Sequence, residues 1–167
     1  MMTEERSAGA PPEAERRMFL VVVDESEELH VALRFACRRA QRTGGRVALL
    51  YVMEPSDFAH WMAVKKVMEE EQRTAAEERL QSLSSMVMEW TGEMPVLFIR
   101  DGSRRDELLR LMDEEPAISI LVLGAARTPG GPGPLISALT GKYSEALHVP
   151  LTIVPGTLSK EEIDALT

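Results

Sequence analysis

The residues from Gly124 to Ala138 have the types and the spacing that suit the binding of an anion. This stretch reads GAARTPGGPGPLISA and follows an apolar, β-branched run at 118–123. Glycines leave backbone N–H groups accessible, and the positive end of a following helix adds to their attraction for a phosphate. Open α/β sheets bind their ligands at this position, beyond the carboxyl ends of the strands. We therefore expect a nucleotide or another anion here; the alternative is an irregular surface loop without a ligand.

No other set of side chains in the sequence predicts catalysis or a metal site. His30, His60 and His148 are far apart and lack the spacing of metal ligands. The sequence holds no nucleophile elbow, metal-binding motif or intact P-loop lysine signature. Because nothing positions an attacking group, we predict a binding protein rather than an efficient catalyst, with no catalytic residue and no metal ligand.

The elements that would position the 124–138 loop alternate between strand and helix. Short, continuously apolar runs suit strands that are buried on both faces, and apolar residues at i, i+3, i+4 spacing suit amphipathic helices. Ser26 and Ser103 are the expected N-caps of two of these helices. The alternation predicts an α/β fold, a parallel sheet with helices on both faces. Strands are expected at 19–23, 47–52, 96–99, 118–123 and 151–154, and helices at 26–41, 62–90, 103–114 and 135–147.

Composition and charge limit the class of protein and its partners. At 167 residues the chain is long enough for one domain with its own core. We expect a disordered N-terminal leader at 1–17, the domain at 18–155, and a helical tail at 156–167 that Ser159 and Glu162 cap. The formal net charge of −8 argues against binding to nucleic acid or to an anionic membrane. No hydrophobic segment precedes Arg17, so the expected location is the cytoplasm.

Five segments, taken in chain order, carry a family resemblance: FLVVVDESEE, LLYVMEP, VLFIRDGSRRDELLRL, SILVLGAAR and VPLTIVP. Together they resemble the universal stress protein family over nearly the whole of 18–155. The resemblance implies an adenine nucleotide alpha hydrolase-like fold, a Rossmann-like open sandwich with a five-stranded parallel sheet in the order 3-2-1-4-5. It also implies a homodimer, with ATP binding in some members and none in others.

The phosphate-binding motif of the family is only partly kept in this chain. Nucleotide-binding members carry Gly, two residues, Gly, nine residues, and then Gly followed by Ser or Thr. Gly124 matches the first position, whereas Arg127, Ser137 and Ala138 stand at the others. Ala138 has no hydroxyl for a phosphate, and a residue with a side chain at a glycine position costs about 1–2 kcal/mol where φ is positive. Compensation is expected from the N–H groups of Gly130, Gly131 and Gly133 and from the charge of Arg127.

An alternative alignment places Gly141 and Lys142 at the end of the motif. It shortens the final helix, so we prefer the first alignment.

Two further residues match positions that the family uses for the nucleoside. Asp24 corresponds to the acidic residue at the end of the first strand, and Val52 to a position whose backbone meets the adenine. The alternatives are that Asp24 only stabilises a turn and that Val52 is only a core residue.

The resemblance favours a stress-response protein that binds ATP or another adenine nucleotide, either alone or together with Mg²⁺. Hydrolysis of ATP would at most be weak. One alternative is the same fold without nucleotide binding, acting as a dimeric interaction module with unknown protein partners. A third interpretation, an adenylyl-transferring enzyme, would need a phosphate loop near the first strand, where the acidic residues at 24–28 would repel phosphates.

The last strand predicts how two copies would associate. In the implied order it lies at the edge of the sheet, and Val149 to Val154 carries no charged residue. Proteins normally cover or pair such an edge. We expect two copies of the strand to pair in an antiparallel homodimer; the alternative is that the tail from Leu158 covers the edge within one chain.

Overall fold

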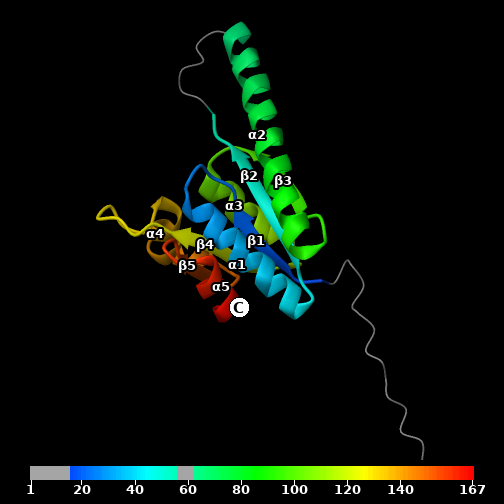
Figure 1. Cartoon of the computed structure of the whole chain (residues 1–167). Helices are drawn as coiled ribbons and strands as arrows, with labels where there is room; N and C mark the ends of the chain where they lie inside the picture. Colours follow the sequence, from blue (N-terminus) through cyan, green and yellow to red (C-terminus); the bar gives the residue numbers. More distant parts are fainter. Residues whose placement is uncertain (1–15, 56–61) are drawn as a thin grey trace, which may run out of the picture.

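The computed structural model describes residues 16–55 and 62–167, and within them it contains one five-stranded parallel sheet (Figure 1). The order of the strands is β3-β2-β1-β4-β5, which confirms the predicted topology. The strands are β1 (Met18–Val22), β2 (Arg46–Met53), β3 (Val96–Asp101), β4 (Ile118–Ala125) and β5 (Leu151–Pro155).

Helices cover both faces of this sheet, as the alternating sequence pattern predicts. The helices α1 (Glu28–Thr43) and α2 (Met62–Thr91) pack on one face, and α3 (Arg104–Glu114) and α4 (Pro134–Thr140) pack on the other. Side chains of β1 alternate between the two layers: Val21 joins the first cluster and Leu20 the second. The central strand is therefore buried on both sides, which explains its continuously apolar sequence.

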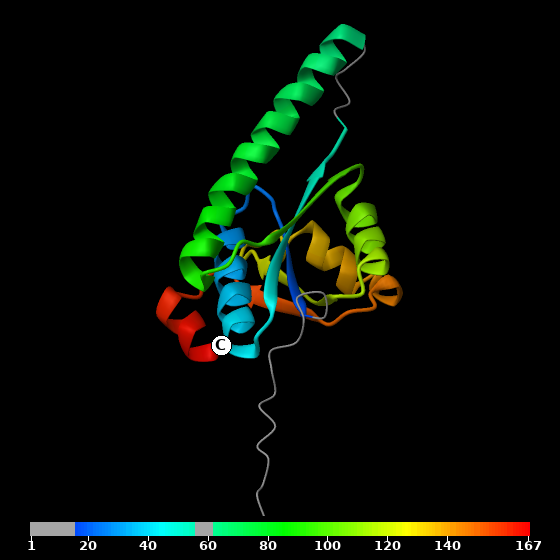
Figure 2. The same ribbon diagram turned by 90° about the vertical axis from the view of Figure 1, so that its right-hand side faces the viewer.

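The long helix α2 is packed on the sheet along only part of its length. Its buried residues begin at Ala76, and the first half of the helix extends beyond the body of the protein (Figure 2). The second half packs through Leu80, Leu83 and Val87.

The turn after β1 differs from the sequence prediction. α1 begins at Glu28, and the preceding residue Glu27 makes no side-chain cap bond. The predicted N-cap Ser26 instead donates from its N–H and its hydroxyl to Asp24. The N-cap prediction for Ser26 is therefore wrong, because the turn that ends β1 uses this serine as a donor. Ser103 does stand at the N-cap position of α3, although without a side-chain cap bond.

The helix predicted at 135–147 is also shorter than expected. α4 ends at Thr140, Gly141 follows it with φ −110° and ψ −114°, and a 3₁₀ turn, η2 (Ser144–Ala146), completes the segment. Glycine in the middle of a helix costs about 1 kcal/mol relative to alanine, which favours a break here. The long final helix, our reason for preferring the first alignment over the one through Gly141 and Lys142, is therefore absent.

The C-terminal segment forms a helix, α5 (Lys160–Leu166), that packs against α1. Ser159 and Glu162 form a reciprocal capping box at its start, and Ile163 is buried. The carboxylate of Asp164 accepts hydrogen bonds from Arg34 (2.8 and 3.1 Å) and Arg38 (3.1 Å). These arginines hold the pKa of Asp164 below its usual value. The tail is thus fixed to α1 of its own chain, and β4 is the one strand paired with β5 in the described part of the chain.

Most of the predicted N-terminal leader, residues 1–15, lies outside the described residues.

Candidate functional site

Two adjoining pockets lie at the carboxyl ends of the central strands. The first, about 210 Å³, lies by β1 and β4, and the second, about 150 Å³, by β1 and β2. Asp24 and Arg104 line both pockets, so they join the two into one cleft. This is the edge of an α/β sheet at which ligands bind.

Asp24 is held in place by the turn after β1. Its Oδ1 atom accepts hydrogen bonds from the N–H of Ser26 (2.9 Å) and from the Ser26 hydroxyl (2.6 Å). Arg79 also donates to the backbone carbonyl of Asp24, at 3.4 Å. Both carboxylate bonds use the same oxygen, and within residues 16–55 and 62–167 the second, Oδ2, has no hydrogen-bond partner. Asp24 therefore stabilises its turn and still has an acceptor for a ligand.

Val52 lies where β1 and β2 separate. The last backbone bond between the two strands runs from the N–H of Val23 to the carbonyl of Leu50 (2.8 Å). The N–H and C=O groups of successive residues in a strand point alternately to its two neighbours, so those of Val52, like those of Leu50, point toward the β1 side. No backbone bond to β1 involves Val52 in the part of the chain that the structure describes. Its side chain is buried in the core, and Val52 lines the smaller pocket.

Gly124 lines the pocket by β1 and β4. Close packing against α1 also explains why this residue is a glycine. It lies within β4, opposite Val154 of β5. A Cβ atom at this position would lie 2.4 Å from the backbone oxygen of Glu28 and 2.7 Å from its Cβ. The absence of a side chain therefore lets the first turn of α1 approach β4.

The loop after β4 folds back on itself. The N–H of Gly131 donates to Thr128 (3.0 Å) and the N–H of Ala126 to Pro132 (3.1 Å). The loop also contains prolines, which have no N–H to donate. It therefore presents fewer free donors than its glycine content predicts.

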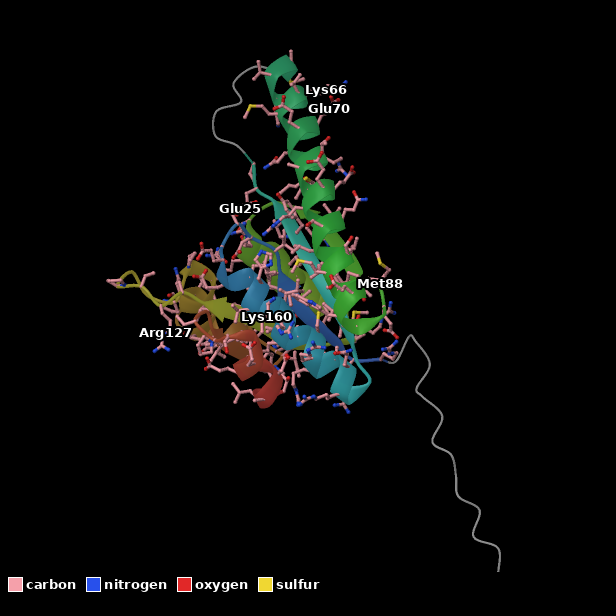
Figure 3. All side chains as sticks on the ribbon, viewed as in Figure 1. Glu25, Lys66, Glu70, Met88, Arg127 and Lys160 are labelled. Carbon is pink, nitrogen blue, oxygen red and sulfur yellow. The ribbon has the colours of Figure 1, made fainter. Side chains whose placement is uncertain are left out.

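Five of the predicted site residues do not line either pocket. Arg127 is exposed on the outer surface (Figure 3), and Gly130 and Ser137 are exposed as well. Gly131 and Ala138 are half-buried but are likewise outside the lining of the cleft. The structure thus brings Asp24, Val52 and Gly124 to one cleft and places these five residues away from it; their roles remain predictions.

Arg104 is the cleft residue that the sequence analysis missed. It is the first residue of α3, and its Nε atom is buried without a hydrogen-bond partner among the described residues. In the described part of the chain its one ion pair, with Glu54, spans 3.6 Å. The available signal was its position: Arg104 follows Gly102-Ser103, directly after the end of β3.

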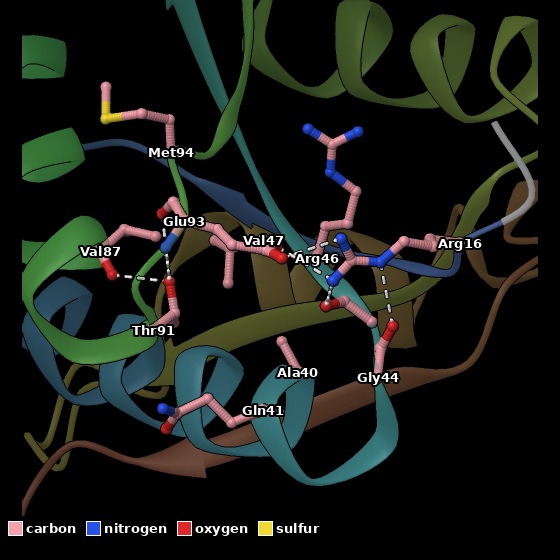
Figure 4. Close-up of a pocket in the computed structure, with 11 residues that line it drawn as sticks. Arg16, Ala40, Gln41, Gly44, Arg46, Val47, Val87, Thr91, Glu93 and Met94 are labelled. Carbon is pink, nitrogen blue, oxygen red and sulfur yellow. Dashed lines mark hydrogen bonds and ion pairs between the residues drawn. The ribbon is translucent and has the colours of Figure 1, made fainter. Parts of the chain in front are cut away.

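A third pocket, about 280 Å³, lies at the opposite end of the sheet (Figure 4). Here Arg16 donates to the carbonyls of Gly44 (3.1 Å) and Gly45 (2.7 Å) and to the carboxylate of Glu93 (3.0 Å). The hydrogen bond from Arg16 holds the pKa of Glu93 below its usual value. These groups satisfy one another, so they stabilise the entry of the chain into the sheet.

Metal binding and membrane insertion find no support in the described residues. No group of three or more His, Cys, Asp or Glu side chains is placed to hold a metal ion in residues 16–55 and 62–167. His60 lies outside these residues. Among the described helices, none is both long and apolar enough to cross a membrane.

Comparison with protein families gives one match that spans most of the chain. The model of the Universal stress protein family matches residues 15–155. The chain belongs to this family. A comparison with curated proteins finds no match.

Solved structures of universal stress proteins are similar to this chain in fold. UspA from Lactobacillus plantarum is 21% identical, with a TM-score of 0.68, and the match covers 84% of this chain and 98% of that one. A universal stress protein in complex with cAMP is 15% identical, with a TM-score of 0.59 and coverage of 84% and 98%. The protein from Archaeoglobus fulgidus in complex with dAMP is 19% identical, with a TM-score of 0.54 and coverage of 83% and 97%.

Proposed function

We propose that this universal stress protein binds an adenine nucleotide, ATP or AMP, in the cleft at the carboxyl ends of β1, β2 and β4. The observation that carries this proposal is the meeting of three groups in one cleft. Within the described residues, Asp24 offers a carboxylate oxygen without a partner, Val52 offers backbone groups that are not bonded to β1, and Arg104 offers an unpaired Nε–H. A carboxylate suits the hydroxyls of a ribose, backbone groups suit the edge of a base, and a guanidinium suits a phosphate.

The similar structures add support for the class of ligand. Two of them were solved with cAMP and with dAMP, both adenine nucleotides. The ligand would regulate the protein in a cytosolic stress response. Mg²⁺ would bind only together with ATP. Hydrolysis of ATP would be weak at most.

Release of bound nucleotide tests the proposal directly. The protein is purified from cells and denatured, and the supernatant is analysed by chromatography and mass spectrometry. We expect an adenine nucleotide in near-stoichiometric amount from the wild type and less from Asp24→Asn, which keeps the Oδ1 acceptor of the turn but loses the charge. Asp113→Asn, at an exposed position on α3, is the matched control.

The alternative is an interaction module that has lost nucleotide binding. It predicts no nucleotide in the supernatant and no binding of adenosine, AMP or ATP to the purified protein. Those results together would end the proposal.

We also propose a homodimer through β5, on a separate observation. Ile153 is 42% exposed on this edge strand, and α5 packs on α1. Antiparallel pairing of two copies of Leu151–Pro155 would satisfy the free edge.

Sedimentation of the wild type and of Ile153→Lys tests the dimer. We expect the variant to be a monomer with an unchanged circular dichroism spectrum, because the lysine charge disrupts the pairing without entering the core. Thr157→Lys, just beyond β5, is the control. A wild type that sediments as a monomer at micromolar concentration would contradict the dimer.

A further inference from the structure

Arg104 has binding capacity that the protein itself does not use. Its Nε atom is buried, with no partner in the described part of the chain. The contact with Glu54 spans 3.6 Å, longer than a hydrogen bond, and that carboxylate is half exposed. A guanidinium has five N–H donors in a fork that matches two oxygens of a phosphate. Leaving a buried donor unpaired is unfavourable, which favours an anionic ligand at this point.

The position of Arg104 in the cleft determines which phosphate of a bound nucleotide it would contact. It lines both pockets together with Asp24, which lies between the backbone of Val52 and the β4 side of the cleft. A nucleoside with its base at Val52 and its ribose at Asp24 would therefore carry its first phosphate close to the guanidinium.

The β4 side of the cleft carries features that disfavour further phosphates, although Gly133 also lines it. Glu28 lines it with Pro132 and Pro134, and its side chain lies close to Gly124 and Gly156. A carboxylate repels additional phosphate charge, and prolines donate no hydrogen bond. The N–H of Ala126 is already bonded to Pro132.

On the basis of the proposed function, we propose that Arg104 binds the first phosphate of the nucleotide and that the cleft prefers a nucleoside monophosphate to a triphosphate. Arg104 would hold the phosphate by its charge, where the glycine motif of the family would use backbone N–H groups. Glu54 competes with the phosphate for the same guanidinium and so weakens binding.

Calorimetric titration of the full chain with adenosine, AMP and ATP, the last with and without Mg²⁺, tests this proposal. We expect the wild type to bind AMP more tightly than ATP. Arg104→Ala should weaken AMP binding about 10–100-fold, the range for a lost hydrogen bond to a charged group, and leave adenosine binding within about twofold. Glu54→Gln should strengthen AMP binding.

Two further variants separate this role from a structural one. Arg105→Ala is the matched control, because the Arg105 guanidinium lies 4.0 Å from the ring centroid of Tyr143 and does not line the cleft. Arg104→Lys keeps the charge but loses the fork, so its AMP affinity should lie between those of the wild type and Arg104→Ala. Circular dichroism confirms folding; if Arg104→Ala does not fold, Arg104→Lys and Glu54→Gln decide.

The outcomes distinguish this inference from the proposed function. Equal effects of Arg104→Ala on AMP and adenosine, no effect on either, or tighter binding of ATP than of AMP would overturn the role of Arg104 and leave nucleotide binding intact. A wild type that binds none of the three ligands would contradict the proposed function itself.

Discussion

The two ends of the sheet each hold a pocket with arginines, and they differ in how far their polar groups are satisfied. At the amino ends of the strands Arg16 is bonded to two carbonyls and a carboxylate. Arg46 has an unpaired Nε there, but it lies near the carboxyl ends of α1 and α2, whose dipoles oppose an anion. At the other end Asp24, Val52 and Arg104 all retain groups without a partner among the described residues. The cleft at the carboxyl ends joins pockets of about 210 and 150 Å³, and the pocket at the amino ends has about 280 Å³, so volume alone does not identify the site.

The largest effect is expected from closing the packing space at the cleft. Gly124→Ala would place a Cβ 2.4 Å from the backbone oxygen of Glu28, so α1 or β4 must shift. We expect the free energy of unfolding to fall by about 3 kcal/mol, as for an overpacked core site. Urea denaturation measures it, with Gly130→Ala as the control because the nearest atom to its added Cβ is 3.7 Å away. Equal stability of the two variants would disprove this packing role.

Replacement of Arg16 should lower the stability of the fold and leave the affinity for AMP unchanged. Arg16→Ala loses the hydrogen bonds to Gly44, Gly45 and Glu93, so we expect the free energy of unfolding to fall by about 1–2 kcal/mol. AMP affinity should remain that of the wild type, since the cleft lies at the other end of the sheet. The exposed neighbour Arg17→Ala is the control. A loss of AMP binding in Arg16→Ala would show that the amino-end pocket takes part.

Stability should also depend on pH through Glu93. Its folded pKa lies below the ordinary value of 4.5, so its contribution is present above that value and is lost as the pH falls through the folded pKa. Because Glu93 is half exposed, we expect Glu93→Gln to cost only about 0.5 kcal/mol at pH 7. Urea denaturation should find no difference between variant and wild type in strong acid. A difference that persists there would contradict the pairing.

The smallest effect is expected at the C-terminal helix. Asp164→Asn weakens the contacts with Arg34 and Arg38, so the amides of α5 should exchange hydrogen faster while the sheet is unchanged. Hydrogen exchange followed by mass spectrometry measures this, with Glu161→Gln as the control. Unchanged exchange in α5 would contradict a stabilising role for the carboxylate of Asp164.

The fold was predictable because it depends on local patterns that repeat. Continuous apolar runs mark the central strands, and the alternation with helices predicts a parallel sheet. The break after α4 was missed because the sequence Leu135 to Leu147 suits a helix except at Gly141, where the chain turns.

The site was predictable in part. Strand ends can be read from the sequence, and this placed Asp24, Val52 and Gly124 at one edge. What depends on tertiary contacts could not be read: the loop bonds of Gly131, the outward direction of Arg127, and the unpaired state of Arg104. The partners of a helical side chain such as Arg104 depend on how the helix packs, which the sequence pattern does not specify.

Nuclear magnetic resonance of the isotope-labelled full chain, titrated with AMP, tests most directly which end of the sheet binds the nucleotide. We predict that the backbone amide signals of Asp24, Val52, Gly124 and Arg104 shift with AMP concentration, while those of Gly44 and Thr91 remain in place. Shifts confined to Gly44 and Thr91, or no shifts at millimolar AMP, would contradict the assignment of the cleft.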